Sequence, residues 1–403
     1  MTKEQNKKAP NLRFKSFTND WEQRKLGEIS ERILRKNSDL QSLLPLTISA
    51  QDGLVDQTIY FNKQVASKQL KNYLLLYNGD FAYNKSYSVG YPYGAIKRLD
   101  KYKQGVLSTL YIAFKPTNIN SDFLQHYYDT DKWYREIYRN AAEGARNHGL
   151  LNIIANDFFN SKLITPSDND EQLKIAKIIN VFNRLITLQQ RKLELLSQLK
   201  QGLIQQNILN QALLNSSSSW PSYKLKDLLK VRKKLQIPDI KYPLASFTVE
   251  KGVTSKTSRY NREFLVQTHN KKYKSTEYHD IVYNPANLKF GAIALNKFGK
   301  ATISPIYETL VPSSKCNVYF LTLIITSPDF IHKALKYQEG TVYERMAVKV
   351  NDLLSMSIHL PNIDTQVKFG EFFYGLDELI YATKNKLEKY QLIKKSLLQQ
   401  MFI

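Results

Sequence analysis

The chain has 403 residues, which is enough for two or three domains with a sizeable core. Its 42% hydrophobic and 23% charged residues are ordinary for a globular protein. No run of 18 apolar residues occurs, and the polar start MTKEQNKKAPNLRF lacks the apolar core of a secretion signal, so we expect neither a transmembrane helix nor export. The single cysteine, Cys316, excludes an intrachain disulfide and a cysteine zinc cluster, which favours a reducing, cytoplasmic location.

Charge is the most informative bulk property. Lys and Arg number 58 against 36 Asp and Glu, giving a formal net charge of +22. A surplus of this size indicates a polyanionic partner, and nucleic acid is the first candidate. An acidic partner subunit is the alternative explanation.

After a loose tail over residues 1–11, we expect the first globular module over residues 12–165. Short strand patterns such as NYLLLYNGDFAYN and GVLSTLYIAF alternate with short helices such as SDFLQHYYDTDKWYREIY. This mixture predicts an α+β module.

We predict one long central helix over residues 166–214. Ser167 and Asp168 supply N-cap signals after Pro166, and no proline follows until residue 221. About 36 helical residues span roughly 54 Å, which is long for a routine core helix. Two adjacent apolar seams on it predict a partner helix and a further contact surface.

A serine-rich linker at residues 215–219 opens the second module, residues 215–360, which has the same kinds of pattern, as in AIALNKFGKATIS, NVYFLTLIIT and SPDFIHKALKYQ. A second long helix follows over residues 361–403, with Asp364 before Gln366 as its N-cap signal.

The two long helices are copies of one another. RKLELLSQLKQGLIQQ at 191–206 matches NKLEKYQLIKKSLLQQ at 385–400, and residues 172–206 and 366–400 share 11 identities in 35 aligned positions. Weaker matches lie upstream: Trp21 with Trp220, GDFAYN at 79–84 with HDIVYN at 279–284, and Pro166 with Pro361. We therefore predict two α+β modules and two antiparallel helices related by an internal pseudo-two-fold repeat; helices that pack only on their own modules are the alternative.

A symmetric scaffold of this kind suits double-stranded DNA. Two-fold DNA-binding proteins read half-sites about one helical turn, roughly 34 Å, apart. Helices of roughly 54 Å can act as a ruler between two modules that read different sequences. Tyrosine is abundant, with 26 residues, and many lie beside Lys or Arg. Such side chains contact phosphates and base edges.

Two sets of site residues follow. The candidate DNA-binding residues are Lys85, Tyr87, Lys97, Arg98, Lys103, Arg146, Asn147, His148, Lys256, Arg259, Lys271, Lys272, Lys274, Lys289, Tyr343 and Arg345. The candidate helix-pair or partner interface is Leu185, Leu193, Leu196, Leu199, Leu203, Leu379, Leu387, Ile393 and Leu397.

The sequence contains none of the catalytic or nucleotide-binding motifs considered below. No Gly-x-Gly-x-x-Gly follows a strand, and no Gly-x4-Gly-Lys-Ser/Thr occurs. Asn284-Pro285-Ala286-Asn287 lacks the second proline and the aromatic residue of an adenine-methyltransferase motif, so we interpret it as a turn. The six histidines form no close metal-ligand pair, and no metal site is predicted.

Taken together, the chain resembles the DNA-specificity (S, or HsdS) subunits of type I restriction–modification enzymes. The resemblance covers nearly the whole length and is carried by WEQRKLGEI, GDFAYN and HDIVYN, LITPSDNDEQLKIAKIINVFNRLITLQQRKLELLSQLKQGLIQQ, and HLPNIDTQ with LIKKSLLQQ. It implies a non-catalytic subunit whose modules each recognise half of a split DNA sequence.

The resemblance also implies partners. Two methyltransferase (M) subunits would dock on the helices and bring S-adenosylmethionine, and restriction (R) subunits would bring ATP and Mg²⁺; no cofactor is expected in this chain. Two hypotheses stay open against it: a stand-alone nucleic-acid-modifying enzyme with an unrecognised site, and a structural adaptor without sequence specificity.

Overall fold

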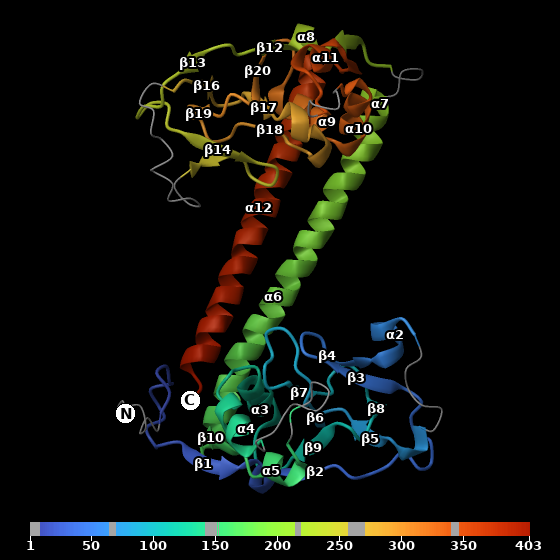
Figure 1. The fold of residues 1–403 in the computed structure, drawn as a ribbon, viewed down its shortest axis with the longest axis vertical. Helices are drawn as coiled ribbons and strands as arrows, with labels where there is room; N and C mark the ends of the chain where they lie inside the picture. Colours follow the sequence, from blue (N-terminus) through green and yellow to red (C-terminus); the bar gives the residue numbers. More distant parts are fainter. Residues whose placement is uncertain are drawn as a thin grey trace. The chain divides into compact units, whose positions relative to one another are not determined.

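The computed structural model describes residues 9–63, 70–141, 151, 153–213, 219–256, 271–339 and 346–403. Contacts divide the chain into two compact units (Figure 1). Unit 1 comprises Met1–Gln189 with Lys386–Ile403, and unit 2 comprises Gln190–Asn385. Each unit therefore contains one module and a part of each long helix.

The module of unit 1 is built on two four-stranded sheets. The first is antiparallel with the order β2-β9-β6-β7, and the second has the order β4-β3-β8-β5, with β3 and β8 parallel. A ribbon of β1 and β10 joins the start of the module to its end. The strands are β1 Glu22–Lys25, β2 Ser30–Arg32, β3 Pro45–Ser49, β4 Gly53–Asp56, β5 Leu74–Tyr77, β6 Phe81–Asn84, β7 Ala95–Arg98, β8 Gln104–Leu107, β9 Ile112–Pro116 and β10 Lys162–Thr165.

Alternation along β6 explains why the first sheet is covered on both faces. Phe81 and Tyr83 face an aromatic core shared with helices, while Ala82 between them faces the core of the second sheet. Successive strand residues point to opposite faces, so large and small residues separate cleanly. The helices are α1 Leu26–Ile29, α2 Gln57–Phe61, α3 Ser121–Tyr128, α4 Tyr134–Asn140 and α5 Ala155–Phe159.

Unit 2 repeats this topology. Its four-stranded sheet has the order β12-β20-β17-β18, which matches β2-β9-β6-β7, and β11 pairs with β21 as β1 pairs with β10. A three-stranded sheet β13-β16-β19 and a hairpin β14-β15 take the place of the second sheet. A parallel bridge from Leu244 to Thr302 links them, as β3 joins β8 in unit 1.

The elements of unit 2 have these bounds: β11 Ser222–Lys224, α8 Leu225–Leu228, β12 Leu229–Val231, β13 Leu235–Gln236, β14 Ala245–Thr248, β15 Gly252–Ser255, β16 Tyr273–Thr276, β17 Ile281–Tyr283, β18 Ile293–Leu295, β19 Ala301–Ile303, β20 Glu308–Pro312, α9 Val318–Ile325, α10 Pro328–Ala334, α11 Val350–Ser355 and β21 Ser357–His359. A 3-10 helix, Pro285–Phe290, begins at Asn284, whose side chain caps it, so the Asn-Pro segment is structural.

Both predicted long helices are present. Helix α6 runs Asn169–Ile204 and continues through a π-helical turn, Gln205–Leu209, into α7, Asn210–Leu213; α12 runs Ile363–Gln400. Asp168 caps α6 by accepting a hydrogen bond from the amide of Asp170 at 2.8 Å. The prediction of Asp364 as the cap of α12 is wrong: Asn362, which the repeat aligns with Asp168, accepts from the Thr365 amide at 2.9 Å, and the helix begins at Ile363.

Within each unit the two helices run antiparallel, as predicted. In unit 1 the rings of Phe182 and Tyr390 lie 6.0 Å apart. The equivalent residues in unit 2, Leu376 and Leu196, meet in its main hydrophobic core. The segment after α12 also enters the core of unit 1, where Phe402 is 1% exposed and its ring lies 5.2 Å from that of Phe123.

Two repeated glutamines join the long helices to the modules. The side-chain oxygen of Gln172 accepts from the Asn120 amide at 2.8 Å, and its nitrogen donates to the Pro166 carbonyl at 2.8 Å. Gln366 does the same in unit 2, with the Asn317 amide at 3.0 Å and the Pro361 carbonyl at 2.9 Å.

Asn120 and Asn317 are themselves the N-caps of α3 and α9. Each glutamine therefore satisfies two backbone groups where a strand ends and a module helix begins, and this explains why both copies keep it. Among the described residues, no helix has the length and apolarity needed to cross a membrane.

Candidate nucleic-acid interface

Each module has an arginine–aspartate pair in which the aspartate is buried and the arginine is half-buried. Arg35 pairs with Asp80, and Arg232 donates to both carboxylate oxygens of Asp280 at 2.7 and 2.9 Å. Burial raises the pKa of Asp80, against the opposing effect of the Tyr77 amide and Arg35. Each arginine links segments of its own module: Arg35 also donates to the Leu75 carbonyl at 2.7 Å, and Arg232 lies 3.5 Å from a carboxylate oxygen of Glu277.

A surface pocket of about 580 Å³ lies beside the β3–β4 hairpin of unit 1. Polar groups of Ser49, Asp52, Asn84 and Ser86 line it together with the rings of Tyr60, Phe61, Tyr87, Tyr91 and Tyr111. The surface around it is unusually apolar, since Ile59 is 77% and Val89 is 89% exposed. We call this site hairpin pocket 1.

The equivalent hairpin of unit 2, β14–β15, borders a pocket of about 750 Å³. Its lining includes Lys251 and Lys256 with the rings of Phe247, Tyr273 and Tyr307. We call it hairpin pocket 2. Pocket 1 has one carboxylate and no lysine in its lining, whereas pocket 2 has two lysines and no carboxylate.

These linings offer different hydrogen-bonding chemistry to a nucleic acid. Carboxylate, amide and hydroxyl oxygens in pocket 1 can accept from the exocyclic amino groups of cytosine or adenine, and lysines in pocket 2 can donate to guanine O6 and N7. Aromatic rings in both can pack against bases or thymine methyl groups.

The structure separates the candidate DNA-binding residues of unit 1 into two groups. Lys97 pairs with Asp129 at 3.0 Å, Arg98 pairs with Asp100 and Asp122 at 2.6 and 2.7 Å, and the Lys85 amine donates to the Ile153 carbonyl. These cations have partners inside the module. Tyr87 and Lys103 are exposed, and Tyr87 lines hairpin pocket 1.

In unit 2 the candidates divide in the same way. Lys274 pairs with Glu308 at 2.8 Å, whereas Lys271, Lys272 and Lys289 are exposed and Lys256 lines hairpin pocket 2. The remaining candidates lie outside the described residues: Arg146, Asn147, His148, Arg259, Tyr343 and Arg345.

Sequence reasoning did not single out Asp52 and Lys251, which sit at equivalent turns. Each lies next to a glycine with positive φ, Gly53 at 84° and Gly252 at 63°. A polar residue followed by glycine between two strand patterns is a hairpin signal, so the two turns were detectable in the sequence.

The candidate helix residues are mostly covered. Leu397 is buried; Leu185, Leu193, Leu196, Leu203, Leu387 and Ile393 are half-buried; and Leu199 and Leu379 remain 52% and 42% exposed. Val181, Leu188 and Leu195 are also exposed, at heptad spacing on α6. Across the described residues, no cluster of three or more His, Cys, Asp or Glu could hold a metal ion.

Comparison with known proteins places these features in context. No protein-family model matches the chain. The specificity subunit of the type I restriction enzyme MjaVIII from Methanocaldococcus jannaschii is 22% identical over 94% of this chain and 91% of its own length. The crystal structure of a type I restriction–modification S subunit from M. genitalium superposes with a TM-score of 0.61, at 15% identity, covering 98% of this chain and 99% of that one.

The fold expected from the sequence, two mixed modules with two long helices, is thus shared with a solved S subunit from end to end. The sequence likeness to a specificity subunit extends over the same length. The resemblance recognised in the sequence is therefore confirmed: along nearly its whole length, this chain is similar to the specificity subunits of type I restriction–modification enzymes.

Proposed function

We propose that this chain is the non-catalytic DNA-recognition subunit of a type I restriction–modification complex, and that each module reads one half of a split DNA sequence. The observation that carries the proposal is the pair of hairpin pockets, which occupy equivalent positions in one repeated topology but differ in lining charge. Two readers that share a framework need different side chains only where they meet different bases. The net charge of +22 supplies the attraction to DNA phosphates.

The long helices have the second role in this proposal. They set the spacer between the half-sites and hold methyltransferase subunits, which bring S-adenosylmethionine; restriction subunits bring ATP and Mg²⁺. Exposed leucines at heptad spacing on α6 support a helical partner, because apolar side chains on such a stripe are normally covered by another helix.

The test is to map methylated adenines in cells that carry this chain with a methyltransferase subunit. We expect one bipartite, asymmetric motif with a fixed spacer, lost when this chain is omitted. A contiguous motif would contradict the proposal. Methylation or cleavage by the purified chain alone would favour a stand-alone enzyme, and equal affinity for random and selected DNA would favour an adaptor.

A further inference from the structure

Hairpin pocket 1 is lined by two turn tips of opposite character. The β3–β4 hairpin presents Asp52, which is exposed and is followed by Gly53 with a φ of 84°. The loop between β6 and β7 presents Val89, which is followed by Gly90 with a φ of 82°. Polar residues and glycine are usual at such tips, so the turn itself does not require a valine that is 89% exposed. The pocket therefore combines one charged tip with one apolar tip.

Local hydrogen bonds hold both tips in place. At the first, the Ser49 hydroxyl donates to a carboxylate oxygen of Asp52 at 2.8 Å and accepts from the Asp52 amide at 3.1 Å. At the second, the Tyr91 amide donates to the Ser88 carbonyl at 2.9 Å, which closes the turn under Val89. No cation among the described residues forms an ion pair with Asp52, so its other carboxylate oxygen is left for a ligand.

The lining of hairpin pocket 1 also contains exposed apolar rings. Val89 is joined there by Tyr60, Phe61 and Tyr87, which are 50%, 44% and 53% exposed. Among the described residues that line hairpin pocket 2, no large apolar side chain is exposed. The connection between β17 and β18 in unit 2 is the 3-10 helix Pro285–Phe290, so the valine turn belongs to the first module alone.

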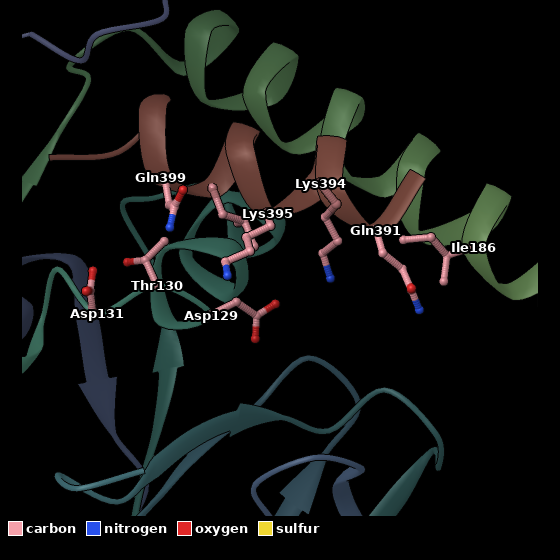
Figure 2. Close-up of a pocket in the computed structure, with 9 residues that line it drawn as sticks. Asp129, Thr130, Asp131, Ile186, Gln391, Lys394, Lys395 and Gln399 are labelled. Atoms are coloured by element: carbon pink, nitrogen blue, oxygen red, sulfur yellow. The ribbon is translucent and has the colours of Figure 1, made fainter. Parts of the chain in front are cut away.

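A further pocket of unit 1 shows that this lining is not general. It has a volume of about 470 Å³ and lies where α12 faces the turn that follows α3 (Figure 2). Its lining carries charges of both signs, from Lys394 and Lys395 on α12 and from Asp129 in the turn. Its aliphatic members, Ile186 and Leu398, are half-buried. Exposed apolar side chains therefore distinguish hairpin pocket 1 from this second pocket of the same unit.

A hydrogen-bond acceptor beside apolar side chains is complementary to an A·T base pair in the major groove. Adenine presents its N6 amino group there as a donor, and thymine presents its C5 methyl group. Cytosine also offers an amino group, but its guanine partner presents two acceptors, which a carboxylate repels, and that pair has no methyl group. The carboxylate and the apolar groups of hairpin pocket 1 thus favour the same base pair.

The repeated topology favours DNA as the occupant of this pocket. The equivalent pocket of unit 2 is lined by Lys251 and Lys256, and the whole chain carries a net charge of +22, both of which suit a polyanion. Lysine donates to guanine O6 and N7, whereas the lining of hairpin pocket 1 has no lysine. Two pockets at one position of the repeat can then serve the same class of ligand and prefer different base pairs.

We propose that hairpin pocket 1 recognises an A·T base pair. Asp52 accepts a hydrogen bond from adenine N6, and Val89, with the neighbouring rings, packs against the thymine methyl group. The assignment rests on the proposed function, because it gives the chemistry of one of the two half-sites. It makes Asp52 and Val89 specificity-determining residues of the first module, and it predicts that one half-site contains a thymine whose methyl group contributes to binding.

The methyl group is tested by the affinity of the assembled complex for duplexes that carry its mapped motif, with deoxyuridine replacing thymine in one half-site at a time. Deoxyuridine pairs as thymine does but lacks the methyl group. We expect the wild-type affinity to fall about fourfold for one half-site, as for the loss of one buried methyl group. Val89→Thr, which exchanges a methyl group for a hydroxyl, should weaken binding to the thymine duplex by a similar factor and have no further effect on the deoxyuridine duplex.

The carboxylate is tested with a purine deoxynucleoside that lacks the N6 amino group, in place of the adenine opposite the sensitive thymine. The wild-type affinity should fall at least fivefold, and Asp52→Ala should bind the normal and the substituted duplex equally. Leu34→Thr is the matched control, since Leu34 is 63% exposed in the same module but lies outside the pocket lining. It should respond to both base analogues as the wild type does.

The possible outcomes separate this assignment from the proposed function. Equal binding to thymine and deoxyuridine duplexes in both half-sites would overturn the assignment, as would an equal loss from Val89→Thr on the two duplexes. Weaker assembly of the Val89→Thr complex with unchanged base discrimination would also overturn it, and would identify the exposed valine as a protein contact. If the wild-type complex yields no bipartite motif, the proposed function fails and the assignment fails with it.

Discussion

At the scale of single residues, both copies of the repeat keep one glutamine for a structural reason. Gln172 and Gln366 are 4% and 2% exposed, and each satisfies one backbone amide and one carbonyl. Their identity in both copies follows from this geometry, since no other side chain of similar size both donates and accepts through a planar amide.

Replacing Gln366 with Ala should lower the free energy of unfolding by about 1–3 kcal/mol, because a buried amide and a buried carbonyl lose their partners. Chemical denaturation followed by circular dichroism measures this change. Gln206→Ala, at an exposed position near the end of the α6 repeat, should change stability by no more than about 0.5 kcal/mol. Equal effects of the two substitutions would contradict a stabilising role for the hydrogen bonds of Gln366.

Each hairpin pocket should determine the base preference of its own module and leave that of the other module unchanged. Lys251→Gln should relax the motif in one half-site only and Asp52→Asn in the other, with discrimination falling by about 1–3 kcal/mol at the affected base. Selection from randomised DNA by the assembled complex measures both. Lys233→Gln, an exposed lysine outside the pocket, should weaken binding to all sequences alike, and a change in both half-sites from one pocket variant would refute independent reading.

The sequence indicates the fold more directly than it indicates which basic side chains are accessible, and for a physical reason. Most of the candidate DNA-binding residues were chosen because they are Lys or Arg. A Lys or Arg side chain can contact a phosphate only if it is not already paired with a carboxylate of the same chain. Arg98 meets Asp122, and Lys274 meets Glu308, only after the chain folds, because these partners are distant in sequence. Only the pairing of Arg98 with Asp100 is local. The useful local signal was the polar–glycine turn at Asp52 and Lys251, which places a side chain at a hairpin tip.

At the scale of elements, the long helices were predictable because periodicity and internal repetition both act over many residues. The cap of α12 was assigned to Asp364 because an acidic residue is a strong N-cap signal, although the repeat aligns Asn362 with Asp168, the cap of α6. The strands of the modules were predictable as a class. Their order was not, because β2 pairs with β9 rather than with a neighbour in sequence.

The helical ruler can be tested by shortening both helices together. Removing residues 188–191 and 382–385, which are equivalent in the repeat, takes about 6 Å from each helix. At about 3.4 Å per base pair the DNA spacer should shorten by about two base pairs, with both half-sites unchanged. Methylation mapping would show this, and an unchanged spacer would exclude the ruler. Shortening one helix alone should instead disturb the antiparallel register and lower stability.

At the scale of the whole molecule, unit 1 is built from segments far apart in the chain. Phe402 is almost fully buried there, with its ring 5.2 Å from Phe123 and 6.2 Å from Tyr127. The aromatic core of the first module therefore includes residues that follow the second long helix.

Phe402→Ala should destabilise unit 1 by about 3–5 kcal/mol, as expected for a large ring removed from a core. Hydrogen exchange resolved by segment should show faster exchange in α3 and little change in α9 of unit 2. Leu392→Ala, on the helix that precedes Phe402 and 68% exposed, should leave exchange in both helices unaffected. Faster exchange in α9 alone would contradict the assignment of this ring to the first unit.

The same arrangement determines when each part can be completed during synthesis. Residues 190–385, which make up unit 2, are synthesised before the segment 386–403 that unit 1 requires. The module translated first is thus the one completed last. A chain whose translation stops before residue 386 would carry a second module with all its residues and a first module whose aromatic core lacks Phe402. Transiently exposed apolar surface of that kind makes an incomplete chain prone to aggregation, so the first module depends on the last segment to be synthesised.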